Sequence, residues 1–234
     1  EPKLERIDYY ATTYECPQCR ETEDPRFIKD EGTPALIPGS YAPSGLAAHV
    51  MYYKYVMSMP LYRQEKDFEH LGVKISRTTM ASWIICCAEN YFLPMYEYLH
   101  RKLLKRRYLM ADETPIQVLK EEGRRPQRKS YVWLVRTGDN GGIPIILYNY
   151  TPTRAGSHAA AFLAGADPGY YLMVDGYKGY NKVPEAQRCC CWAHIRRYWL
   201  RAIPKGHEKD YTHPAVQGFL YCNKLFEYER SYRE

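Results

Sequence analysis

The sequence lacks the features of a membrane-spanning or exported protein. No apolar run in its 234 residues approaches the roughly 20 residues that a helix needs to cross a bilayer. The chain opens Glu1-Pro2-Lys3-Leu4, with neither an initiator methionine nor the apolar segment of a secretion signal. We therefore expect a cytoplasmic protein with no membrane partner. This opening, and the charged helical pattern that runs to Glu234, predict a piece of a longer protein that is truncated at the C-terminus.

The sequence also lacks the regular cysteine spacing of a disulfide framework. Most of its eight cysteines come as close neighbours, and adjacent cysteines are poor partners for such a framework, so we expect reduced thiols. Cys189 and Cys190 look like core residues. Cys16 and Cys19 form a single CxxC pair, of the kind that gives zinc two of its four ligands. No second pair follows at a usual spacing, so either the other half lies upstream of Glu1 or this is not a zinc site.

Positive charge is in modest excess and is clustered. The formal net charge is +6, from 33 Lys and Arg against 27 Asp and Glu. The clusters are at 101–107, 124–129 and 196–205. Clustered cations favour a polyanionic partner such as nucleic acid, although solvated helix ends and loops give the same pattern.

The first part of the chain divides into a polar segment with a linker (1–43) and a helical region (44–107). The stretch Leu61–Ile85 has the length and punctuation of a helix-turn-helix, with Ser76 as the cap of its second helix. A plain helical hairpin fits this stretch equally well, so both interpretations stay open. In a helix-turn-helix, the exposed start of the second helix would carry Arg77, Thr78 and Thr79.

From Tyr108 onward the hydrophobic period changes from helical to strand-like. Three strands come first, joined by hairpin-length connections, and two more follow across helices. This order predicts an α/β domain over 108–234, in which a ribonuclease-H-like mixed sheet has helices on both faces. The first and fourth strands are central neighbours in that fold. The predicted strands are 108–119, 129–136, 144–150, 170–175 and 187–192.

Two of the predicted strands carry one aspartate each in an apolar run. Asp112 interrupts the first strand and Asp175 ends the fourth. An unpaired carboxylate is costly to bury, and two on neighbouring strands can share a divalent cation. A third acid from a later helix would complete a site for two Mg²⁺ ions, which serve phosphodiester chemistry. The candidates are Glu227 and Glu229 on the predicted final helix, whose position favours them, and Glu185 and Glu208 in loops. For either aspartate alone, a cap or turn role is the ordinary alternative.

Cys191-Trp192-Ala193-His194 stands where the fifth strand meets its helix. His194 would lie close to the carboxylates and contact a phosphate, as would Arg196 and Arg197. A buried thiol and a capping histidine explain this short motif equally well.

Four motifs follow one another along the chain from Ala111 onward. They are Ala111-Asp112-Glu113-Thr114-Pro115, Pro152-Thr153-Arg154-Ala155-Gly156, Asp175-Gly176-Tyr177-Lys178-Gly179-Tyr180-Asn181 and Cys191-Trp192-Ala193-His194-Ile195-Arg196-Arg197. Together they resemble the transposases of insertion sequence sixty-six, and Leu61-Tyr62-Arg63-Gln64-Glu65 upstream also looks like that family. The resemblance covers most of the chain, and several motifs in order are far more specific than any one of them.

This resemblance implies a DDE-type transposase that cleaves DNA and transfers strands at transposon ends, with Mg²⁺ or Mn²⁺ as cofactor. It makes Asp112 and Asp175 the first two catalytic acids and metal ligands, and Glu229 is our choice for the third. It also implies a homo-oligomer on DNA, a bacterial nucleoid location, zinc in the full-length parent, and a helical insertion near 198–220. The expected DNA-contacting residues are Arg77, Thr78, Thr79, Arg154, His194, Arg196 and Arg197.

Two other interpretations stay open. The chain could be a DNA-binding protein without catalysis, or a degenerate transposase fragment. It could also be a nuclease that cuts DNA without joining it.

Overall fold

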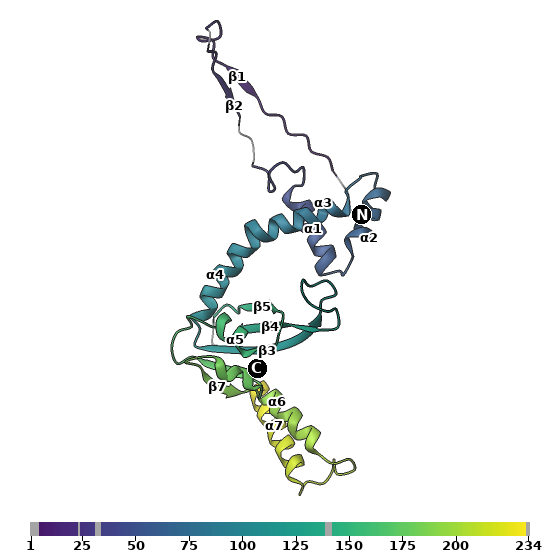
Figure 1. The fold of residues 1–234 in the computed structure, drawn as a ribbon, viewed down its shortest axis with the longest axis vertical. Helices are drawn as coiled ribbons and strands as arrows, with labels where there is room; N and C mark the ends of the chain where they lie inside the picture. The colour runs from purple at the N-terminus through teal and green to yellow at the C-terminus, as the bar shows by residue number, and fades with distance from the viewer. Residues whose placement is uncertain (1–4, 23, 31–33, 139–141, 233–234) are drawn as a thin grey trace. The chain divides into compact units, whose positions relative to one another are not determined.

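The chain divides into two compact units in the computed structural model, which describes residues 5–22, 24–30, 34–138 and 142–232 (Figure 1). The first unit runs to Met95 and the second begins at Tyr96. The three-part division expected from the sequence, with boundaries after residues 43 and 107, stays a prediction. None of the helices in the described ranges is both long enough and apolar enough to cross a membrane.

The first unit contains a short hairpin and a small helical core. The hairpin pairs β1 (Thr13–Glu15) with β2 (Phe27–Lys29), and the sequence did not predict it. Val50, Met80 and Trp83 are buried in the helical core, because each helix turns an apolar side inward. The helices are α1 (Ser44–Tyr55), α2 (Leu61–His70) and α3 (Arg77–Cys87), followed by one π-helical turn, η1 (Ala88–Phe92).

The second unit is built on a five-stranded sheet of order β5-β4-β3-β6-β7. The strands β3, β4 and β5 are antiparallel, whereas β6 runs parallel to both β3 and β7. Helices lie on both sides of this sheet. The strands are β3 (Tyr108–Gln117), β4 (Lys129–Thr137), β5 (Ile146–Thr151), β6 (Tyr171–Val174) and β7 (Gln187–Cys190). The helices are α4 (Leu93–Leu104), α5 (Gly156–Phe162), the 3-10 turn η2 (Lys178–Lys182), α6 (Trp192–Ala202) and α7 (Pro214–Ser231).

This topology confirms the mixed sheet of a ribonuclease-H-like fold. The first and fourth strands of the domain, β3 and β6, are central neighbours, as the strand order predicted. The fifth strand differs from its expected environment. Among the described strands it pairs with β6 alone, at the edge of the sheet, so Cys190 is exposed and Cys189 is only partly buried. The prediction that these cysteines belong to the core was therefore wrong.

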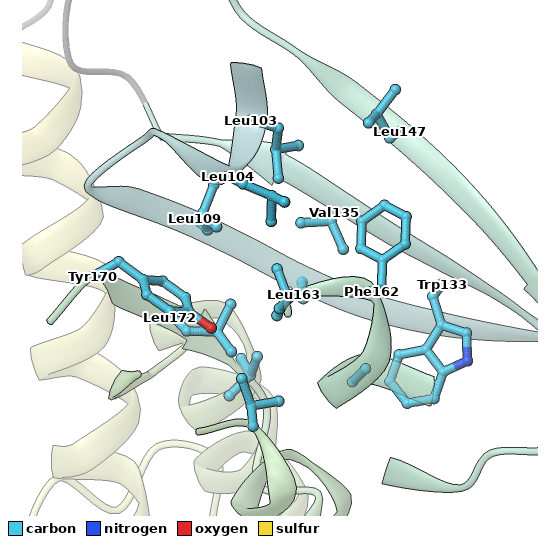
Figure 2. Packing of buried hydrophobic residues seen from close by; sticks show 14 of the residues in the cluster. Leu103, Leu104, Leu109, Trp133, Val135, Leu147, Phe162, Leu163, Tyr170 and Leu172 are labelled. Atoms are coloured by element: carbon cyan, nitrogen blue, oxygen red, sulfur yellow. The ribbon is translucent and has the colours of Figure 1, made fainter. Parts of the chain in front are cut away.

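One face of the sheet holds the hydrophobic core of the second unit (Figure 2). Alternate residues of β3, among them Leu109 and Ala111, point to this face together with Leu172 of β6. Phe162 and Leu163 from the end of α5 pack against them. The residues between, such as Tyr108, therefore point to the opposite face.

Two glycines let the start of α5 lie directly against η2. A Cβ atom on Gly156 would be only 2.0 Å from the carbonyl oxygen of Gly179. Because the obstacle is backbone rather than a flexible side chain, only a glycine fits at this position without moving η2. This contact joins two of the sequence motifs, one leading into α5 and one following β6.

Replacement of Gly156 by alanine should therefore destabilise the second unit. We expect Gly156→Ala to cost about 1–3 kcal/mol, the usual range for overpacking a tight contact, in urea unfolding followed by tryptophan fluorescence. Gly45→Ala is the matched control, because Gly45 lies in α1 with open space around its Cβ position. Equal stability of the two variants would contradict the close approach.

Candidate metal and DNA site

Strand β3 presents two neighbouring acids to opposite faces of the sheet. Glu113 follows the alternation of Leu109 and Ala111 toward the core, and its side chain is only 1% exposed. Asp112 points to the other face and is exposed, with its Oδ1 accepting a hydrogen bond from the backbone N–H of Glu113 at 2.9 Å. The two acids therefore meet different environments although they are adjacent in sequence.

Asp112 and Asp175 occupy corresponding positions along two neighbouring strands. The parallel pairing of β3 with β6 sets Met110 opposite Met173, and two further residues along each strand lead to the two aspartates. Parallel neighbours lie about 4.8 Å apart and point their paired side chains to the same face. Asp175 directly follows β6, and its Oδ1 accepts a hydrogen bond from the N–H of Tyr177 at 2.9 Å.

Arg154 lies between the acids of the two strands. Its Nε donates to Oε1 of Glu113 at 2.7 Å, and its Nη2 forms ion pairs with the same oxygen at 2.5 Å and with Oδ2 of Asp175 at 3.9 Å. The guanidinium stacks on the ring of Tyr177 at 4.0 Å, and the hydroxyl of Tyr177 donates to the carbonyl of Arg154. Burial opposes the charged form of Arg154, but the hydrogen bond and charge of Glu113 outweigh it and raise the pKa of Arg154.

Tyr180 completes the surroundings of Glu113. It is buried in η2, donates its hydroxyl hydrogen to Oε2 of Glu113, and meets the ring of Trp133 edge-on. Burial raises the pKa of Tyr180 strongly, and the negative charges of Glu113, Asp112 and Asp175 raise it further. Tyr180 therefore stays a protonated donor, and the three carboxylates share its neighbourhood.

The first turns of α6 hold the basic residues that the sequence placed near the carboxylates. Arg196 donates from Nε to Oδ1 of Asn223 and stacks on Phe219, so its guanidinium ties α6 to α7. Arg197 is exposed. His194 is partly buried, and its Nδ1 has no hydrogen-bond partner among the residues that the structure describes.

Glu229 lies on the exposed surface of α7. Since Trp199 of α6 packs against Gly218 and Arg196 reaches Asn223, the two helices are antiparallel, and the end of α7 returns to the start of α6. Within the described residues, however, no group of three or more His, Cys, Asp or Glu is arranged to hold a metal ion. Glu229 as the third acid therefore stays a prediction.

Comparison with known proteins identifies the family. The sequence profile described as "Transposase IS66 family" matches residues 39–234. The chain belongs to this family.

Three proteins of Sinorhizobium fredii (strain NBRC 101917 / NGR234) are similar to this transposase-family chain. One, "Uncharacterized protein y4qI", is 28% identical over 252 residues, which cover 100% of the chain and 45% of that protein. Another, "Uncharacterized protein y4jD", is 26% identical over 181 residues, covering 72% of the chain and 35% of that protein. The third, "Uncharacterized protein y4hP", is 24% identical over 212 residues, covering 82% and 37%. The chain spans less than half the length of these relatives.

The transposase-family chain carries its CxxC pair in the loop of the β1–β2 hairpin. The backbone N–H of Arg26 donates to Sγ of Cys19 at 3.3 Å. Hydrogen bonds from the backbone and side chain of Cys19 lower the pKa of Cys16. Such hydrogen bonds favour the thiolate, which is the form that binds metal. Zinc binding by the pair stays a prediction.

The start of α3 carries the three residues expected to contact DNA from a helix-turn-helix. Ser76 caps the helix as predicted, since its Oγ accepts from the N–H of Thr79 at 3.1 Å. Glu65 of the upstream motif accepts from the N–H of Arg77 at 2.9 Å, and so it fixes α2 to the same helix start. The side chains of Arg77 and Thr78 are exposed, whereas Thr79 is partly buried and bonds to the Ser76 hydroxyl.

Sequence reasoning missed Glu113, Tyr177 and Tyr180 as parts of the site. A usable signal was present for Glu113, because it follows Leu109 and Ala111 at the core-facing positions of a predicted strand. A carboxylate at such a position needs a cation or a donor. The two tyrosines were marked only as members of the motif that begins at Asp175, which gave them no role of their own.

The Glu113–Arg154 pair predicts a strong dependence of stability on both partners. Arg154→Met should lower the free energy of unfolding by about 2–3 kcal/mol, below the usual cost for a fully buried pair because Arg154 is partly exposed. The double variant Arg154→Met/Glu113→Gln should recover part of this loss, since no buried charge is then left unpaired. Arg197→Met is the control, because Arg197 is exposed on α6. A double variant as unstable as the sum of both single variants, measured by urea unfolding, would contradict the pairing.

Proposed function

We propose that this chain contains the catalytic aspartates of a DDE transposase, which cleaves DNA at transposon ends and transfers the strands in a metal-dependent reaction. The observation that carries the proposal is the shared level of Asp112 and Asp175 on the two central strands of the sheet. Membership of the IS66 transposase family supports the same chemistry and DNA as the partner.

The donor set around the two aspartates fits a hard divalent cation. Carboxylate oxygens are the ligands that Mg²⁺ and Mn²⁺ prefer, and Asp112 is exposed, with no ion pair among the described residues. Asp112 and Asp175 would hold the cation, with Glu229 as the proposed third ligand. A bound cation would supply activation of the attacking oxygen and stabilisation of charge on the phosphodiester.

Arg154 is proposed to bind the DNA phosphate nearest to the carboxylates. Its side chain is 42% exposed, so one edge is free to meet a ligand while the other is held by Glu113. Two tyrosines restrict the position of Arg154. Tyr180 donates a hydrogen bond to Glu113, the partner of Arg154, and Tyr177 stacks on the guanidinium. An arginine held in this way reaches a phosphate with little loss of side-chain entropy.

The other proposed DNA contacts lie at two helix starts, where Arg77, Thr78 and Arg197 are exposed. Arg77, Thr78 and Thr79 begin α3, and His194, Arg196 and Arg197 begin α6. Assembly as a homo-oligomer on DNA, a bacterial nucleoid location and a zinc module completed in a longer parent belong to the same proposal.

One observation favours a second candidate, a DNA-binding or degenerate transposase fragment without catalysis. Within the described residues, no group of three or more His, Cys, Asp or Glu is arranged to hold a metal ion. Such a fragment would bind DNA in a salt-sensitive manner, with no effect of divalent metal.

Replacement of either aspartate should abolish cleavage and leave DNA binding intact. With a plasmid that carries both ends of the parent element, we expect Asp112→Asn and Asp175→Asn to slow Mg²⁺-dependent nicking by more than about 100-fold, since each removes a metal ligand. Asp167→Asn is the matched control, because Asp167 pairs with Lys105 on the surface at 2.6 Å. Cleavage at the original rate by both variants would rule out the proposed role.

A strand-transfer assay with a precut transposon end separates the remaining functions. Joining of that end to target DNA identifies a transposase, and cutting without joining identifies a nuclease. Binding without either reaction identifies the non-catalytic candidate.

A further inference from the structure

The connection between β3 and β4 is a strongly basic, folded loop. We call residues 118–129 the basic tip. This segment leads from the end of β3 at Gln117 to the start of β4 at Lys129 (Figure 1). Two acids, Glu121 and Glu122, stand against five cations in this segment. The cations are Lys120, Arg124, Arg125, Arg128 and Lys129.

Glu121 holds the basic tip in one conformation. Its Oε2 accepts from Nη1 of Arg124 and from the hydroxyl of Ser130, both at 2.8 Å, and its Oε1 accepts from the hydroxyl of Tyr150. The hydrogen bond from Tyr150, followed by those from Ser130 and Arg124, lowers the pKa of Glu121, so these contacts act on the ionised carboxylate. A side-chain amide of Gln117 also donates to the carbonyl of Pro126 at 3.0 Å.

This network leaves the other arginines of the tip directed to solvent. Arg125 and Arg128 are exposed, and neither side chain has an ion pair or hydrogen bond with another residue in the described part of the chain. They lie along an open cleft of about 810 Å³. The cleft is lined by Gly123, Arg124, Arg125, Gln127 and Arg128. Arginines on a fixed backbone suit the oxygens of phosphate groups.

The basic tip extends beyond the carboxylates in the direction of strand β3. Asp112 lies within β3, which continues to Gln117, whereas the parallel strand β6 ends at Val174. At about 3.3 Å per residue, the base of the tip is about 16 Å beyond Asp112. For a DNA duplex whose axis runs along β3, this distance corresponds to roughly five nucleotides.

We propose that the basic tip is a second DNA-binding surface, which contacts the phosphate backbone roughly five base pairs from the reacting phosphate. The proposal rests on the proposed function for the identity of its partner. It adds a contact for the duplex that flanks the cleavage position, separate from the phosphate contact proposed for Arg154. Glu121 acts as a positioning residue, since it fixes the arginines rather than meeting DNA itself.

The test measures binding of the full chain to a fluorescent 40-base-pair duplex in EDTA, over 50–200 mM NaCl. Arg125→Ala/Arg128→Ala should weaken binding about tenfold at 100 mM NaCl and reduce the salt slope by about 1.8, which corresponds to two lost phosphate contacts. Lys209→Ala/Lys224→Ala removes the same charge from the α6–α7 hairpin and should change affinity less than about twofold. Equal effects of the two double variants would overturn the proposal.

Glu121→Ala separates a folded binding surface from simple charge attraction. The substitution makes the chain more positive, so charge alone would tighten DNA binding. We expect weaker binding instead, by about threefold or more, because Arg124 and the tip backbone lose their anchor. Circular dichroism and urea unfolding of each variant establish that the sheet is intact. Binding as tight as that of the original chain, or tighter, would overturn the positioning role.

The outcomes separate this proposal from the proposed function. If the original chain does not bind the duplex at all, the proposed function fails. If it binds and the tip variants bind equally well, only the proposal about the basic tip fails.

Discussion

The ion pair between Glu113 and Arg154 is the interaction on which the rest of the site depends. Glu113 is nearly inaccessible to water, so its charge is tolerable only with a cation and a donor beside it. Arg154 and Tyr180 supply these from the loop before α5 and from η2. One buried carboxylate therefore joins three motifs that are far apart in the sequence. It also holds the guanidinium of Arg154 next to Asp175.

The neighbouring residue, Asp112, gains its role from the same strand. Because side chains alternate along β3, an acid anchored in the core is followed and preceded by residues on the other face. Asp112 is thus left exposed at the level of Asp175, while Glu113 organises the interior. The basic tip continues the same strand beyond both acids. A single hairpin thereby connects the core, the candidate metal site and the proposed contact with flanking DNA.

The sequence was sufficient to predict the order of the sheet, because the change from helical to strand-like period at Tyr108 is a local pattern. It also singled out Asp112 and Asp175, whose catalytic role stays a prediction. It was not sufficient for features that depend on distant partners. The contact of Glu113 with Arg154 crosses 41 positions and that with Tyr180 crosses 67. The edge position of β7, which exposes Cys190, likewise depends on which strand lies beside it.

The most direct test of the central claim is the anomalous scattering of Mn²⁺ in crystals of the full chain. The account predicts one peak shared by carboxylate oxygens of Asp112 and Asp175, at about the 2.0–2.4 Å expected for a hard cation. Peaks bound to one aspartate alone, or carboxylates too far apart to share an ion, would contradict it.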